Sequence, residues 1–292
     1  MNQDVKLSIV IVSFNTKALV VQCLKHLLTS QFPNNWEVIV VDNASTDGTV
    51  NEVESGKWKV ESEKLKIIKN KTNVGFSVAN NQGMKLGNGE YILLLNSDTM
   101  ASPQAVQTVL TYLEKHEEAG VATCKLVLSD GRIDPASHRG FPTPWAAFTY
   151  FAGLEKLFPK SQLFSQYHQW YKDLTRTHEI DSPSGAFFMV RRRVVDEVGL
   201  LDESYFMYAE DLDFAYRIKG TGWKIVFIPD TAVTHLKKQS GWASGDEVKQ
   251  REAKKHFYET MLQFYNKHYR GEYNSLVTAF VTMAIRLRLM SL

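Results

Sequence analysis

Cysteine is scarce in this chain. Cys23 and Cys124 are the only two among 292 residues, and they form no C-x-x-C pair. This scarcity excludes a disulfide framework and argues against a zinc or redox site built from thiolates. Because both cysteines lie in apolar segments, we expect two buried thiols in a reducing compartment.

Long apolar runs are also missing. No stretch of about 18 apolar residues occurs, so the sequence predicts no transmembrane helix. Residues 1–6 are polar and lead directly into a strand-like segment, which is not the pattern of a signal peptide. These absences favour a cytoplasmic location. If the protein attaches to the inner face of the plasma membrane, we expect its C-terminal residues to make the contact.

The chain has almost no net charge. It carries 34 Lys and Arg against 32 Asp and Glu, a net charge of +2, so nothing in the composition indicates a nucleic-acid partner. From Lys237 onward, however, there are ten basic residues against five acidic ones. Residues 246–292 form basic amphipathic helices that fit an anionic membrane surface. The alternative is that these helices pack on the domain and turn a charged face to water.

Short apolar strands alternate with helical patterns along most of the chain. This alternation indicates βαβ units with right-handed crossovers, and therefore an α/β, Rossmann-like, mostly parallel sheet flanked by helices. One late strand, over residues 223–228, is expected to stop at Pro229 and Asp230. The other strands are expected at residues 7–13, 36–41, 65–68, 91–95 and 121–128, and residues 181–191 are expected to form a turn followed by a strand. The main helices are expected at residues 18–28, 76–86, 103–117, 194–198, 210–220, 247–267 and 276–292.

Polar residues follow three of these strands at once. The strand ends read Ser13-Phe14-Asn15, Asp42-Asn43 and Asn96-Ser97-Asp98. Ligands of open α/β sheets bind outside the carboxyl ends of the strands, so we expect these side chains at one cleft. Asp98 would present its carboxylate to a ligand or metal there. The alternative for Asp98 is to cap the helix that has Pro103 in its first turn.

Two further positions bear on chemistry. Asp98 and His235 are suitable ligands for Mg²⁺ or Mn²⁺, which bind one or two protein groups and complete their shell with phosphates and water. Glu210 and Asp211 stand at a predicted helix start, with Asp213 close behind. A carboxylate at this point either caps the helix or takes a proton from an attacking hydroxyl.

Residues 138–179 differ from the rest of the chain because they show no clear period. A long irregular stretch of this kind is usually a functional loop, and its aromatic content suits contact with sugar faces or lipid. A small satellite core is the equal alternative. The aromatic residues are Phe141, Trp145, Phe148, Tyr150, Phe151, Phe158, Phe164, Tyr167, Trp170 and Tyr171.

Taken together, these motifs resemble a family 2 glycosyltransferase of the GT-A fold over roughly residues 6–240. Within that family the chain most resembles bacterial enzymes of surface-polysaccharide assembly, notably the dTDP-rhamnosyltransferase-like branch. The motifs that carry the resemblance are residues 8–15, residues 40–48, Asn73-Val74-Gly75-Phe76 with Asn80, Asn96-Ser97-Asp98, Ser184-Gly185-Ala186, residues 208–213 and His235.

The resemblance implies a domain plan and a role for each motif. Residues 1–245 would form the GT-A catalytic domain, divided into a nucleotide-sugar half (1–130) and an acceptor half (131–245), and residues 246–292 would form a C-terminal helical extension. Asp98 and His235 would hold Mg²⁺ or Mn²⁺, although Asn96 replaces the first carboxylate of the family's D-x-D motif. Asp211 would be the catalytic base, with Glu210 as the second candidate. The donor-binding residues would be Ser13, Asn15, Asp42, Asn43, Asn73, Gly75, Asn80, Asn96 and Ser97, and the acceptor-side residues Ser184, Gly185 and Ala186.

The implied reaction is a single displacement with inversion. The donor would be a nucleotide sugar, with L-rhamnose from dTDP-rhamnose as the best guess and a UDP-sugar as the alternative. The acceptor would be a hydroxyl of a lipid-linked or growing cell-surface glycan. Whether the protein forms a homodimer stays open.

The sequence disfavours several other classes of enzyme and leaves one alternative open. No G-x-G-x-x-G follows the first strand, which disfavours a Rossmann dehydrogenase. A processive synthase is disfavoured because the Q-x-x-R-W motif and membrane helices are missing. A nucleotidyltransferase would leave Glu210 and Asp211 unexplained. A non-catalytic subunit that binds glycan or nucleotide stays open because Asn96 stands where the family has an acid.

Overall fold

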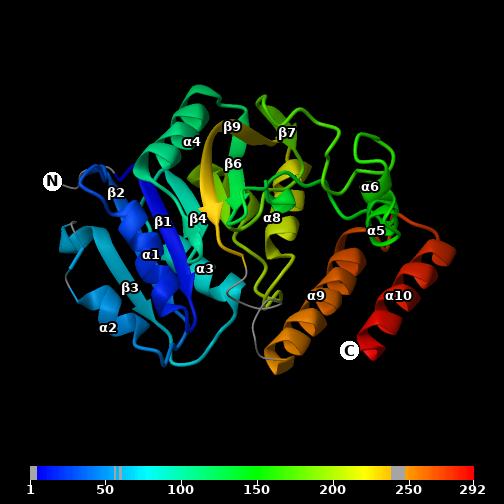
Figure 1. Cartoon of the computed structure of the whole chain (residues 1–292), viewed down its shortest axis with the longest axis horizontal. Coiled ribbons are helices and arrows are strands. Elements are labelled where there is room, and N and C mark those ends of the chain that lie inside the picture. Colours follow the sequence, from blue (N-terminus) through cyan, green and yellow to red (C-terminus); the bar gives the residue numbers. More distant parts are fainter. Residues whose placement is uncertain (1–4, 56, 59–60, 238–246) are drawn as a thin grey trace.

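A computed structural model gives the fold of residues 5–55, 57–58, 61–237 and 247–292 (Figure 1). Residues 1–4, and the predicted domain boundary between residues 245 and 246, lie outside this described part. Figure 1 shows a central twisted sheet with helices on both faces and two long helices, α9 and α10, beside it.

The described strands form one nine-stranded sheet in the order β3-β2-β1-β4-β8-β6-β9-β5, with β7 paired to β9. The first four strands of this order pair in parallel. The strands are β1 (Leu7–Ser13), β2 (Trp36–Asp42), β3 (Leu65–Lys69), β4 (Tyr91–Asn96), β5 (Thr99–Met100), β6 (Ala119–Leu128), β7 (His178–Ile180), β8 (Phe187–Arg191) and β9 (Lys224–His235).

Helices cover both faces of the sheet because its central strands are apolar on both sides. One core lies under α1 (Lys17–Leu27), α2 (Thr49–Glu54) and α4 (Pro103–Lys115). The other lies under α3 (Phe76–Leu86), α7 (Arg192–Val198) and α8 (Glu210–Gly220). The predicted α/β architecture with flanking helices is therefore confirmed.

The parallel register brings the three polar strand ends to one edge of the sheet. Ser13 at the end of β1 is opposite Asp42 at the end of β2. Val12 is opposite Asn96 at the end of β4. The expectation that these strand ends share one edge is confirmed, because strands that start in register and have similar lengths also end together.

The second half of the sheet is mixed. β8 runs antiparallel to both of its neighbours, β4 and β6, whereas β9 returns parallel to β6. β5 and β7 both pair antiparallel with β9. The parallel pairing expected of βαβ units is thus concentrated in the first half of the chain.

The prediction that Pro229 and Asp230 end the last strand is wrong. β9 continues to His235, and its register with β6 passes from Ile228 opposite Cys124 to Ala232 opposite Lys125. Residues 229–231 therefore bulge out of the ladder. Because Pro229 lies in this bulge, its missing N–H removes no ladder hydrogen bond.

The irregular aromatic segment contains two short helices, α5 (Pro144–Phe151) and α6 (Leu154–Leu157). Some of its rings contact one another, as in the pair Tyr150 and Tyr167 with centroids 5.4 Å apart. Others, including Phe148 and Phe151, are exposed. The segment is therefore partly a small satellite core and partly an apolar surface.

The C-terminal helices are α9 (Glu247–His268) and α10 (Ser275–Met290), joined by a short turn. α9 packs on α8 through Phe264 and Tyr265, and Tyr269, which directly follows α9, joins the same cluster. Within the described residues, neither of these helices nor any other has the length and apolar character to cross a bilayer.

Candidate functional site

The ends of β1 and β4 are joined by hydroxyl contacts. Ser13 Oγ lies 2.9 Å from Thr16 Oγ1, and Thr16 Oγ1 lies 3.4 Å from Ser97 Oγ. Asn15 takes a left-handed backbone conformation with φ of 52° and accepts the backbone N–H of Thr46 at 2.8 Å. These contacts fix the loop after β1 against the loop after β2.

Asp42 is a buried carboxylate with one oxygen in use. Its Oδ2 accepts the backbone N–H of Ser45 at 2.9 Å. Its Oδ1 is buried and has no hydrogen-bond partner among the described residues. Because a buried carboxylate oxygen is costly without a donor, Oδ1 is available to a donor group of a ligand.

Asn43 ties the second strand end to the loop before α3. Its amide donates to Asn73 Oδ1 and to the Gly75 carbonyl, both at 3.1 Å. Gly75 has φ of +89°, and Phe206 passes so close that a Cβ on Gly75 would lie 2.7 Å from the Phe206 ring. Asn80 is buried in α3 and donates to the carbonyl of Phe76 at 2.9 Å, so its amide stabilises the first turn of this helix.

Asp98 and His235 face each other across the pairing of β5 with β9. Asp98 Oδ1 lies 3.4 Å from His235 Nε2. The opposite ring nitrogen, Nδ1, lies 2.8 Å from Asp134 Oδ2. The alternative in which Asp98 caps α4 is wrong, because Ser102 caps that helix by accepting the N–H of Ala105.

Asp134 was not anticipated from the sequence, and it determines the state of the histidine. Burial disfavours the charged imidazolium, but hydrogen bonds to Asp134 and Asp98 and the charges of both raise the pKa of His235 to about 9. The pKa of Asp134 is lowered despite its burial, because His235 and Lys237 both contact its carboxylate. A carboxylate on Nδ1 leaves Nε2 available as a ligand atom.

The residues around Asp98 are chemically suited to a divalent cation. A carboxylate and an imidazole with a carboxylate behind it are familiar ligands of such ions. The buried amide oxygen of Asn96 has no partner among the described residues, and it is also a hard oxygen ligand. Within the same part of the chain, no group of three or more acidic, histidine or cysteine side chains forms a ready-made metal site. A bound cation would therefore need oxygens from its substrate.

Asp211 is held by three donors at the start of α8. Its Oδ2 accepts a guanidinium N–H from Arg139 at 2.7 Å and the backbone N–H of Gly185 at 2.9 Å. Its Oδ1 accepts the backbone N–H of Leu212 at 2.7 Å. Since Oδ1 accepts from one donor among the described residues, it keeps a lone pair for a further proton.

Glu210, its neighbour, is in a different electrostatic state. Burial is the main reason that its pKa is raised above the ordinary glutamate range, and the charge of Asp211 adds to the effect. Its Oε2 is buried without a partner in the described chain. Of the two candidate bases, Asp211 is the one that pairs with a cation, Arg139, whereas Glu210 favours the neutral form.

The turn at residues 184–186 connects Asp211 to the end of β4. The backbone of Ala186 accepts the N–H of Asn96 at 3.3 Å, and Gly185 donates to Asp211. Ser184 Oγ accepts the N–H of Ala186 at 3.2 Å, which stabilises the turn. Because of this continuous chain of contacts, the loop at residues 184–186 fixes Asp211 relative to the end of β4.

Asp213 does not belong to the site. It is fully buried and bonds Arg217 on its own helix at 2.9 Å. It also contacts Lys267 at 2.6 Å and His268 at 2.7 Å, both on α9. Its role is to attach the C-terminal helices to α8.

Sequence reasoning missed Arg139 as well as Asp134. Arg139 follows no strand and belongs to no motif, so no local pattern reveals it. Asp134 follows β6, and a general search for acids just beyond strand ends would have found it. Arg139 contacts Asp211 across 72 positions and Asp134 contacts His235 across 101 positions, and only the folded chain brings such residues together.

Comparison with known proteins agrees with this geometry. The family model described as "Glycosyl transferase family 2" matches residues 8–199. The chain is 27% identical over 218 residues to N-acetylglucosaminyl-diphospho-decaprenol L-rhamnosyltransferase of Mycobacterium tuberculosis, covering 70% of this chain and 67% of that protein. It is 28% identical over 130 residues to the putative glycosyltransferase EpsE of Bacillus subtilis, which covers 44% of this chain and 46% of the relative.

Solved structures share the fold. S. aureus TarS superposes with a TM-score of 0.58 at 19% identity, covering 97% of this chain but 43% of TarS. The mannosyltransferase PcManGT from Pyrobaculum calidifontis, solved with GDP-Man and Mn²⁺, superposes with a TM-score of 0.63 at 15% identity, covering 97% of this chain and 72% of that one. The predicted GT-A fold is confirmed by these neighbours.

Proposed function

Because the chain belongs to glycosyl transferase family 2, we propose that it is an inverting transferase that moves a sugar from a nucleoside diphosphate to a hydroxyl of a cell-surface glycan. The observation that carries this proposal is the link between Asn96, Ala186, Gly185 and Asp211. It couples the strand end that carries Asp98 to a carboxylate suited to deprotonate an acceptor.

The first half of the sheet supplies the donor side. Asp42, with its unpartnered Oδ1, would accept an N–H of the nucleotide base, and Ser13 and Asn15 would contact base and ribose. Asn43, Asn73 and Gly75 would shape the cleft around the donor, with Asn96 and Ser97 at its far side. Asn80 would act indirectly, by supporting the first turn of α3.

Transfer proceeds by one displacement. Asp211 Oδ1 takes the proton of the acceptor hydroxyl while the oxygen attacks C1 of the sugar. The bond between C1 and the diphosphate oxygen breaks as the new bond forms on the opposite face, so the configuration inverts and the nucleoside diphosphate leaves with the electron pair. Arg139 and Gly185 hold Asp211 in place for this step.

We further propose that Asp98 and His235 bind a divalent cation, Mg²⁺ or Mn²⁺, and that the Asn96 amide oxygen is a further ligand of this ion. When bound, the cation offsets the negative charge that develops on the departing diphosphate. Asp134 keeps the His235 ring oriented with Nε2 toward Asp98.

For the substrates, we propose dTDP-L-rhamnose as donor and a lipid-diphosphate-linked saccharide as acceptor. The support is the relative from M. tuberculosis, whose name includes both a rhamnosyl group and a decaprenol-linked acceptor. A UDP-sugar is the alternative donor, supported by the TarS structure solved with UDP-GlcNAc. The division into a nucleotide-sugar half (1–130), an acceptor half (131–245) and a C-terminal extension (246–292) is part of this proposal, as is a cytoplasmic site of action.

A donor screen tests the proposal. Purified protein is given dTDP-rhamnose or UDP-sugars with Mn²⁺ and a lipid-diphosphate disaccharide, and release of nucleoside diphosphate is measured. We expect the parent protein to release nucleoside diphosphate. Asp211→Asn should lower the rate of this release by at least about 1,000-fold and should still bind the donor. Asp196→Asn, an exposed change on α7, serves as the matched control.

A non-catalytic binding subunit is the second candidate, favoured by the amide at Asn96 in place of a carboxylate. It predicts metal-independent donor binding and no release of nucleoside diphosphate with any acceptor. Turnover that is lost in Asp211→Asn and kept in Asp196→Asn would reject it.

A further inference from the structure

One face of α10 carries a row of uncovered apolar side chains. Leu276 is 80% exposed and Met290 is 83% exposed, with three more apolar residues between them at 55–57%. The spacing of four, three, four and three residues places all five on one side of the helix. We call this row the α10 stripe: Leu276, Phe280, Met283, Leu287 and Met290.

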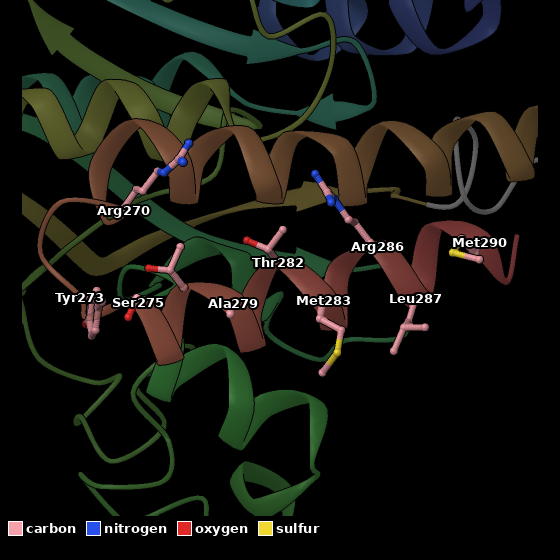
Figure 2. Close-up of a pocket in the computed structure, with 10 residues that line it drawn as sticks. Arg270, Tyr273, Ser275, Ala279, Thr282, Met283, Arg286, Leu287 and Met290 are labelled. Atoms are coloured by element: carbon pink, nitrogen blue, oxygen red, sulfur yellow. The ribbon is translucent and has the colours of Figure 1, made fainter.

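The opposite side of α10 is already occupied. Ile285 is buried, Val281 packs on the cluster formed by α8 and α9, and Thr278 bonds the Tyr265 hydroxyl at 2.9 Å. Figure 2 shows Arg286 directed toward α9, whereas Met283 and Leu287 are directed away from it. The α10 stripe is therefore not needed to hold the helix on the domain.

The apolar surface continues onto the aromatic segment. Figures 1 and 2 show α5 beside the first turns of α10. α5 exposes Trp145, Phe148 and Phe151, and the chain after it exposes Leu157, Phe158 and Leu163. Exposed apolar side chains that gather on neighbouring elements in this way are typical of an interaction surface rather than of scattered exposed residues.

Basic residues predominate around this surface, although Glu272 is exposed in the turn before α10. α10 contains Arg286 and Arg288 and no acidic residue. Lys156 and Lys160 are exposed beside the aromatic side chains, while Glu155 is buried against His168. A groove of about 760 Å³ runs beside α10 (Figure 2). It is lined by Arg270 from the turn before the helix, by polar α10 residues and Arg286, and by three members of the α10 stripe, Met283, Leu287 and Met290.

We propose that the α10 stripe and the exposed side chains of α5 and α6 dock on an anionic lipid bilayer. The apolar side chains would enter the boundary between headgroups and acyl chains. The arginines and lysines would contact lipid phosphates, and Arg270 and Arg286 would admit a phosphate into the groove. Because α10 contains two arginines and no acidic residue, a second copy of α10 at this face would bring like charges together, which disfavours such a dimer.

A chain of contacts connects this surface to Asp211. The ring of Tyr150 on α5 contacts Tyr167, whose carbonyl accepts the N–H of Gly140 at 2.8 Å. Gly140 follows Arg139, which holds Asp211. Docking on this face would hold a lipid-linked acceptor near the segment that positions Asp211. The inference therefore deepens the proposed function and rests on it for this last step.

The test is sedimentation of the full chain with vesicles. Phosphatidylcholine vesicles are compared with vesicles of phosphatidylcholine and phosphatidylglycerol in equal amounts, at low and high salt. We expect binding to the anionic vesicles that weakens with salt. Met283→Gln with Leu287→Gln should lower the partition coefficient about tenfold. Arg286→Gln with Arg288→Gln should lower it about 25-fold, at about fivefold per arginine.

Leu86→Gln is the matched control, because Leu86 is an exposed apolar residue at the end of α3, outside the surface. It should change binding by less than about twofold. Phe148→Ser with Phe151→Ser tests the α5 part separately. All these residues are exposed, and melting curves check that each variant is folded.

Three results would overturn the inference. The first is equal affinity of the protein for both kinds of vesicle. The second is binding to anionic vesicles that neither the stripe variants nor the α5 variant reduces. The third is a dimer, seen by sedimentation equilibrium, that Met283→Gln with Leu287→Gln dissociates while binding to vesicles persists. Vesicle binding needs no turnover, and hydrolysis of the donor needs no vesicle. Failure of this inference is therefore distinguishable from failure of the proposed function.

Discussion

The Arg139 guanidinium lies 2.7 Å from the Asp211 carboxylate although the two residues are 72 positions apart in the chain. The same nitrogen donates to the carbonyl of Pro183 at 2.8 Å. Arg139 therefore fixes the proposed base and the beginning of the acceptor-side turn together. Both side chains are largely buried, so the pair is shielded from salt more than a surface pair would be.

We predict that Arg139→Met lowers kcat about 100-fold with little change in KM for the donor. The reason is that Asp211 loses the contact that positions it, and small displacements of a catalytic group carry penalties of this size. Arg139→Lys should recover part of kcat, since it keeps the charge. Steady-state kinetics measures both, with Arg132→Met on an exposed turn as control. An effect confined to the donor KM would assign Arg139 to substrate binding.

Glu210→Gln should flatten the pH dependence of stability. Burial, with the charge of Asp211, raises the pKa of Glu210 to about 8 from the model-compound value of 4.5. The folded state thus binds this proton more tightly than the unfolded chain. The stability that Glu210 contributes is complete below pH 4.5 and is lost as the pH rises through 8.

Melting curves from about pH 5 to about pH 9 test this prediction. The glutamine variant should gain on the order of 5 °C over the parent at the alkaline end and little at the acid end. Glu117→Gln, an exposed change, should follow the parent throughout. Because Asp211 is the proposed base, Glu210→Gln should also keep far more turnover than Asp211→Asn. Equal loss in the two variants would argue against that assignment.

Asp134→Asn should weaken the binding of Mn²⁺ alone by about 10- to 100-fold. The carboxylate of Asp134 accepts the Nδ1–H of His235 and so directs Nε2 to Asp98. An amide holds the ring less firmly and removes a negative charge near the cation. Titration followed by electron paramagnetic resonance measures the free ion, with Asp130→Asn on the preceding turn as control. Unchanged affinity would mean that His235 is not oriented through Asp134.

Gly75→Ala should destabilise the fold by about 2–4 kcal/mol. Gly75 has φ of +89°, and a Cβ there would lie 2.7 Å from the Phe206 ring and 2.9 Å from the Phe206 carbonyl oxygen. Chemical denaturation measures the change in the free energy of unfolding. Gly220→Ala is the control, since a Cβ on Gly220, at the end of α8, meets no atom within 4 Å. Similar stability of the two variants would mean that the loop before α3 moves freely.

The sequence by itself determined the first half of the molecule. Runs such as residues 7–13 and 91–95 are apolar on both faces, and an apolar strand of this kind can be stable only inside a sheet covered by helices. Asp42 and Asp98 were located as strand-end residues for the same reason. Their position follows from the end of an apolar run, which is a local property of the chain.

The tertiary structure alone decided the second half of the site. The bulge at residues 229–231 lets β9 continue past Pro229, and that continuation places His235 beside Asp98. Arg139 and Asp134 reach their partners across 72 and 101 positions, and no local pattern encodes such contacts. The exposure of the α10 stripe is likewise a property of packing. An apolar row on a helix predicts a partner, and only the folded chain shows that α9 occupies the other face.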